Sequence, residues 1–209
     1  MTSRDDPGPR YRELVALYRR MHEAGDVLHG IPPEKTFSGQ SLSPHVERIA
    51  SLVRHFGART LIDYGCGKAL AYRMPKVALP GRMVFEGPLK DFWRVDDVTL
   101  YDPGFAPFAA FPAGPADGVI CTDVLEHLAE DDAGWVIDEI FGLARRFVFC
   151  SVACFPAMKS LPTGENAHVT LKSVGWWADL FEAAAARHKQ VRYMAAYTLA
   201  DGRGVEISG

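Results

Sequence analysis

The stretch that decides the fold reads Thr60-Leu61-Ile62-Asp63-Tyr64-Gly65-Cys66-Gly67-Lys68-Ala69. Its first three residues start a short apolar run that predicts a buried parallel strand. Gly65 and Gly67 then allow a sharp turn that brings bare backbone amides close to a ligand, which indicates a nucleotide-type pocket. A dinucleotide site is disfavoured, because its fingerprint needs a third glycine where Leu70 stands.

Apolar periodicity outward from this stretch predicts strands that alternate with helices. Strands are expected at 60–62, 98–101, 116–123 and 147–152, with a short one near 109–111 and a closing hairpin of 191–199 and 204–208. Helices are expected over 11–21, from an N-cap at Ser43 to Gly57, from Leu70 onward, over 131–144 and after Ser173. This order predicts an α/β fold with a mostly parallel sheet, a C-terminal antiparallel hairpin and helices on both faces.

The length of 209 residues fits one domain, residues 1–209, with a full-sized core. Residues 1–10 are polar and are expected to form a loose lead-in to the N-terminal helix. The rest of segment 1–42 holds an irregular loop at 36–39 that is either a lid or a surface loop, and residues 75–97 form an insertion.

Composition and charge limit the kinds of binding partner that we expect. The net charge of −3 shows no basic stripe, which disfavours tight binding to nucleic acid. The chain has no apolar run of about 18 residues and no apolar signal segment, so we expect a cytoplasmic protein without a membrane partner. The four cysteines show no Cys-x-x-Cys pair and are expected to be reduced and mostly buried.

Acidic residues close three of the predicted strands: Asp63, Asp102 and Asp123. In doubly wound sheets the ligand lies outside the carboxyl ends of the strands. A carboxylate at the tip of the second strand is the acceptor that a ribose diol needs, which fits Asp102. The alternative is that Asp102 caps the turn before Pro103.

Two motifs resemble the class I S-adenosylmethionine (SAM) dependent methyltransferases. The first is acid-x-Gly-x-Gly-x-Gly, matched at Asp63, Gly65 and Gly67, with Ala69 in place of the last glycine. The second reads Ala116-Asp117-Gly118-Val119-Ile120-Cys121-Thr122-Asp123-Val124-Leu125-Glu126-His127-Leu128. The resemblance covers residues 44–155 and implies the Rossmann-like methyltransferase sheet, with SAM as cofactor. It assigns the ribose to Asp102, although the gap from residue 63 to residue 102 exceeds the family's usual spacing of about twenty.

The resemblance also implies roles for the strand ends. Gly65, Cys66 and Gly67 would border the methionine portion of SAM, while Cys121 and Thr122 would pass beneath the cofactor and Asp123 would lie beside it. Glu126 and His127 would face the acceptor. His127 is either a general base near its working pKa or a side chain that hydrogen-bonds the backbone at a helix start.

A metal site is an open alternative. Asp123, Glu126 and His127, joined by His168, resemble the ligands of metal-dependent O-methyltransferases, including the ubiquinone-pathway and small-RNA 2′-O-methyltransferase groups. Two carboxylates and two imidazoles can bind Mg²⁺, Mn²⁺, Fe²⁺ or Zn²⁺, and such an ion would lower the pKa of a substrate hydroxyl.

The sequence therefore predicts a SAM-dependent methyltransferase that acts on oxygen or nitrogen of a small or medium-sized polar acceptor. The catalytic candidates are Glu126, His127 and His168. The alternatives are a metal-dependent O-methyltransferase acting on an RNA end or a diol, a non-catalytic SAM-binding partner subunit and, last, a nicotinamide oxidoreductase.

Overall fold

A single mixed sheet organises the chain. The computed structural model describes residues 2–79 and 83–209. The sheet has six strands in the order β4-β1-β5-β6-β7-β8. Their bounds are β4 Asp97–Tyr101, β1 Thr60–Tyr64, β5 Ala116–Thr122, β6 Ala144–Ala153, β7 Arg192–Thr198 and β8 Gly204–Ser208. The first five pair in parallel, and β8 runs antiparallel to β7 at the edge.

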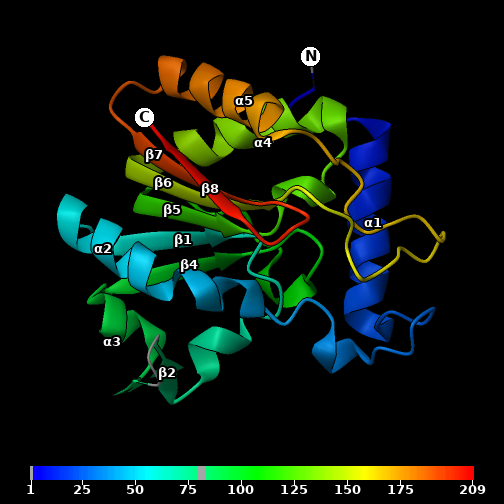
Figure 1. The fold of residues 1–209 in the computed structure, drawn as a ribbon, viewed down its shortest axis with the longest axis horizontal. Coiled ribbons are helices and arrows are strands. Elements are labelled where there is room, and N and C mark those ends of the chain that lie inside the picture. Colours follow the sequence, from blue (N-terminus) through cyan, green and yellow to red (C-terminus); the bar gives the residue numbers. More distant parts are fainter. Residues whose placement is uncertain (1, 80–82) are drawn as a thin grey trace.

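Helices cover both faces of this sheet (Figure 1). One face carries α4 (Glu130–Gly142) and α5 (Val174–Arg187), and the other carries α2 (Val46–Phe56) and α3 (Leu89–Trp93). The predicted α/β architecture, mostly parallel with a C-terminal antiparallel hairpin, is confirmed at this level. No helix among residues 2–79 and 83–209 has the length and apolar character needed to cross a membrane.

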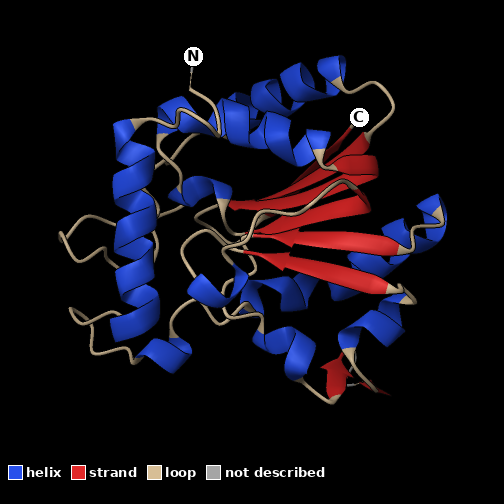
Figure 2. Cartoon of the chain, turned by 180° about the vertical axis from the view of Figure 1, so that it is seen from behind, coloured by secondary structure: helices blue, strands red, loops and turns tan. Residues whose placement is uncertain are grey.

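The N-terminal helix α1 (Pro9–Ala24) takes a position of its own. It lies across the end of the sheet at which the parallel strands finish, as the arrowheads in Figures 1 and 2 show. Because ligands of doubly wound sheets bind at this end, α1 is placed to cover a binding site.

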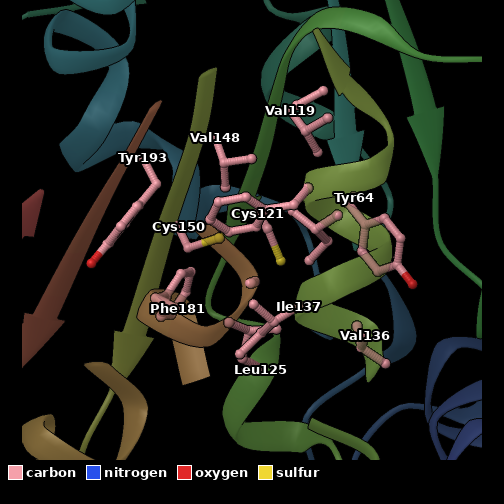
Figure 3. Packing of buried hydrophobic residues seen from close by; sticks show 14 of the residues in the cluster. Tyr64, Val119, Cys121, Leu125, Val136, Ile137, Val148, Cys150, Phe181 and Tyr193 are labelled. Atoms are coloured by element: carbon pink, nitrogen blue, oxygen red, sulfur yellow. The ribbon is translucent and has the colours of Figure 1, made fainter. Parts of the chain in front are cut away.

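The core between the sheet and α4–α5 is continuous. Cys121 and Cys150 face each other in the register of β5 and β6, and Figure 3 shows their sulfur atoms among Leu125, Ile137 and Phe181. Three of the four cysteines, Cys66, Cys121 and Cys150, are buried, Cys154 is partly buried, and all four are free thiols, as expected. A run of apolar side chains along β5 and β6 is what a parallel sheet buried on both faces requires.

Several local predictions were wrong. Residues 109–111 form no strand. Phe111 is 40% exposed, and the guanidinium carbon of Arg4 lies over its ring, 3.7 Å from the ring centroid. Pro107 and Pro112 flank this segment, and each lacks the N–H that a sheet ladder needs. Arg4 also pairs with Glu139, so the N-terminal lead-in is tied down rather than loose.

The helix starts also differ from prediction. Ser43 does not cap α2; a 3-10 helix (Gln40–His45) precedes it, and Gly57 ends α2 with φ 59° as predicted. The helix expected from Leu70 is a 3-10 turn, Leu70–Arg73. The other 3-10 turns are Pro33–Lys35, Ala106–Phe108 and Leu125–His127. The predicted insertion 75–97 holds α3 and a small antiparallel sheet, β2 (Lys76–Ala78) with β3 (Val84–Glu86); its residues 80–82 lie outside the described residues.

Candidate functional site

A pocket opens between α1 and the carboxyl ends of β1, β4 and β5. It holds about 830 Å³ of space, solvent at its mouth included. The strand ends line it with Tyr64, Gly65, Gly67, Asp102, Pro103, Gly104, Thr122, Asp123, Val124, His127 and Leu128. The cover lines it with Tyr11, Leu14, Val15, Tyr18, His22, Phe37, Gly39 and Ser41.

The glycine turn after β1 forms one wall of the pocket. Gly67 has φ 57°, and a Cβ at this position would lie 2.4 Å from the carbonyl oxygen of Phe37. Both the backbone conformation and the close approach of the loop at 36–39 therefore require glycine here. Ala69, at the position of the motif's last glycine, also adopts a left-handed conformation, with φ 51°. Its small side chain accommodates a geometry that glycine normally supplies.

Asp102 lies in the pocket wall at the tip of β4. Its Oδ2 accepts a hydrogen bond from the Gly67 amide at 2.9 Å, and its Oδ1 accepts one from the Gly104 amide at 2.8 Å. Burial raises the pKa of Asp102, and these amide hydrogen bonds oppose that shift. The carboxylate thus caps the turn that follows it, which was the alternative prediction for Asp102. It also fixes the glycine turn. A carboxylate has about four acceptor sites, so two remain for a ligand.

Asp63 lies behind the pocket rather than in it. The side chain is 3% exposed, and its Oδ2 accepts a hydrogen bond from Tyr72 at 2.7 Å. Its Oδ1 has no hydrogen-bond partner among the described residues. Burial raises the pKa of Asp63 to about 7, and the nearby Asp102 charge adds to that shift. Asp63 therefore shapes the site from within the core.

The end of β5 divides between core and pocket. Thr122 and Asp123 line the pocket, whereas Cys121 and Cys66 are buried and lie outside its lining. Asp123 has φ 53°, an uncommon conformation for a residue with a side chain. Ser151 holds it there, because the Asp123 amide donates to the Ser151 hydroxyl and that hydroxyl donates to Oδ1, both at 3.1 Å. Desolvation by the surrounding protein raises the pKa of the Asp123 carboxyl.

His127 lines the pocket and is a neutral imidazole. Burial, followed by the neighbouring His168, lowers the pKa of His127 to about 3. Its Nδ1 lies 2.8 Å from the carbonyl oxygen of Ala167, so Nδ1 carries the proton and Nε2 the lone pair. Of the two predicted roles of His127, the structure shows the hydrogen bond to the backbone, and the role as a general base stays a prediction.

Glu126 and His168 do not line the pocket. Glu126 is fully buried; its Oε1 accepts a hydrogen bond from the Ala153 amide at 2.8 Å, and burial raises its pKa. The His168 ring lies 4.9 Å from that of His127, with Nδ1 2.6 Å from the Phe155 carbonyl oxygen. Among residues 2–79 and 83–209, no group of three or more histidine, cysteine, aspartate or glutamate side chains is arranged to hold a metal ion.

The cover of the pocket is joined to its floor. The Lys68 and Leu70 amides donate to the carbonyl oxygens of Phe37 and Ser38, at 2.8 and 3.0 Å. The Tyr18 hydroxyl lies 2.9 Å from the Ala167 carbonyl oxygen. Loop 36–39 therefore packs against the glycine turn and lines the pocket through Phe37 and Gly39, and its role as a lid stays a prediction.

His22 is a polar residue of this cover that sequence reasoning missed. Its side chain is 5% exposed and lines the pocket beside Asp102. The signal was its position four residues after Tyr18, which puts both side chains on one helix face.

Sequence comparisons add no relatives to this picture. No protein-family model matches the chain, and no curated protein is significantly similar to it.

Proposed function

We propose that the chain is a SAM-dependent methyltransferase whose cofactor occupies the pocket under α1. One observation carries the proposal: the glycine turn after β1, the carboxylate of Asp102 and the residues at the tip of β5 line a single pocket at the carboxyl ends of the strands. A nucleoside needs an acceptor for its diol, and the Asp102 carboxylate in this wall offers one beside the glycine turn. Figure 2 shows how α1 closes this end of the sheet.

The residues of the pocket fit such a ligand. Asp102 retains acceptor sites for ribose hydroxyls, and Gly65 and Gly67 present backbone without side chains. When bound, SAM supplies a sulfonium-bound methyl group and leaves as a neutral thioether. The rings of Tyr18 and Phe37, 5.3 and 6.0 Å from that of His127, form an aromatic enclosure that suits a cation and excludes water.

The acceptor is expected to be a small or medium-sized polar molecule with a nucleophilic oxygen or nitrogen. With a pKa near 3, His127 orients the acceptor by accepting a hydrogen bond at Nε2 and contributes little as a base near neutral pH. Alignment and exclusion of water then provide most of the rate acceleration.

Calorimetric titration with S-adenosylhomocysteine tests the proposal. Saturable binding is expected, weakened at least about tenfold in Asp102→Asn because a carboxylate accepts stronger hydrogen bonds than an amide does. Asp91→Asn, at an exposed position on α3, is the matched control and should bind like the wild type. Equal affinity in Asp102→Asn contradicts the ribose role, and binding of NAD(H) instead of the adenosyl ligand contradicts the proposal.

Two further measurements separate the alternatives. A chain that binds S-adenosylhomocysteine yet transfers no labelled methyl group to any compound of a metabolite extract is a non-catalytic subunit. Heat on titrating Mg²⁺, Mn²⁺ or Zn²⁺ into the S-adenosylhomocysteine complex, with loss of activity on chelation, supports the metal-dependent alternative. Its predicted ligands are Asp123, Glu126, His127 and His168.

A further inference from the structure

His22 is held rigidly in the wall of the pocket. Its ring stacks on Phe105 at 4.9 Å between centroids with an interplanar angle of 28°, and Phe37 lies 5.1 Å away on a tilted plane. Side chains packed in this way keep one orientation, so a polar atom on the ring points in a fixed direction.

Lys68 determines which ring nitrogen of His22 carries the proton. Its ammonium group donates to the carbonyl oxygens of His22 and Thr36, both at 3.0 Å, and lies 3.3 Å from Nδ1 of His22. An ammonium group can only donate, so Nδ1 must accept. Burial, with the Lys68 charge, lowers the pKa of His22 to about 4, so the ring is neutral and its one proton sits on Nε2.

This Nε2–H group lies beside the Asp102 carboxylate. The separation between Nε2 and Oδ2 is 3.9 Å, too long for a direct hydrogen bond. An oxygen atom about 2.8 Å from each would bridge them, accepting from Nε2–H and donating to Oδ2. The bridging group must both accept and donate a hydrogen bond, as a water molecule or the hydroxyl of a ligand does. In the described part of the chain, no side chain or backbone group forms a hydrogen bond with Nε2 of His22.

From this geometry we infer that His22 and Asp102 together recognise one hydroxyl of a nucleoside sugar, and that His22 is a specificity-determining residue for ribose over deoxyribose. The inference rests on the proposed function. It assigns α1 a direct contact with the ligand in addition to its role as a cover. Lys68 is a positioning residue, because it acts only by fixing the proton of His22 on Nε2.

The test compares adenosine with 2′,3′-dideoxyadenosine by calorimetry. Wild type is expected to prefer adenosine. His22→Phe keeps the aromatic packing but lacks the N–H, and should shrink that preference by about three- to tenfold. His22→Gln, which can place an N–H near the same point, should restore part of the preference. The matched control His55→Phe, at an exposed position on α2, should behave as wild type.

A second readout needs no variant. The Nε2–H proton resonance of His22 should shift when adenosine binds the wild type and stay in place with dideoxyadenosine. The inference is overturned if His22→Phe keeps the full preference for adenosine over dideoxyadenosine, or if the resonance responds equally to both ligands. In either case, binding of S-adenosylhomocysteine by the wild type leaves the proposed function standing. Failure of the wild type to bind any adenosyl compound overturns both.

Discussion

Replacing Gly67 by alanine tests the close contact between the glycine turn and the loop that covers it. An L-residue at φ 57° costs about 1 kcal/mol in backbone strain. The new Cβ would also lie 2.4 Å from the Phe37 carbonyl oxygen, and ordinary contacts begin at 3.4 Å, so the loop must retreat by about 1 Å (3.4 − 2.4). That retreat breaks the hydrogen bond from the Lys68 amide to the Phe37 oxygen, which contributes about 1 kcal/mol.

Gly67→Ala should therefore lower the free energy of unfolding by about 2 kcal/mol, measured by urea denaturation. Gly30→Ala is the matched control: Gly30 has φ 65° and nothing within 4 Å of its added Cβ, so only the strain of about 1 kcal/mol applies. S-adenosylhomocysteine binding should weaken in Gly67→Ala and persist in Gly30→Ala. Equal losses of stability in the two variants would refute the argument that the loop is packed against the turn.

Three other predictions concern stability. An acid whose pKa is raised on folding destabilises the protein once it ionises, so the Asp63 contribution is lost as pH rises from about 4 through about 7. Between pH 5 and pH 8 the free energy of unfolding, measured with urea, should fall further for wild type than for Asp63→Asn, by up to about 3 kcal/mol, and parallel declines would contradict the raised pKa. Tyr18→Phe removes the hydroxyl near the Ala167 carbonyl oxygen and should cost about 1 kcal/mol, with no loss if that hydrogen bond is absent in solution. Ser173→Ala removes the cap that accepts from the Trp176 amide and should also cost about 1 kcal/mol, whereas an unchanged midpoint would argue against the cap.

The sequence was sufficient for the layout of the fold because its signals are local. Apolar runs marked β5 and β6, and Ser173 marked the start of α5, where its side chain accepts a hydrogen bond from the Trp176 amide. The expected position of the ligand, at the strand ends, followed from topology alone. Where local signals conflicted with long-range contacts, as at Phe111 under Arg4, the prediction was wrong.

The sequence could not predict which of the candidate site residues line the pocket and which lie in the core. Side chains alternate along a strand, so Asp63 and Tyr64 point to opposite faces of the sheet, and only the packed structure shows which one reaches the pocket. The pKa of His127 likewise depends on burial against distant segments, including the loop around Ala167. His22 entered the site only because α1 folds back across the strand ends, a long-range contact that its own helix does not encode.

A crystal structure of the chain with S-adenosylhomocysteine tests the central claim most directly. The account predicts the adenosyl ligand under α1, with ribose hydroxyls on Asp102 and the sulfur facing the side of the pocket that holds His127. Ligand density at another place on the molecule, or an adenosine whose ribose does not contact Asp102, would contradict it.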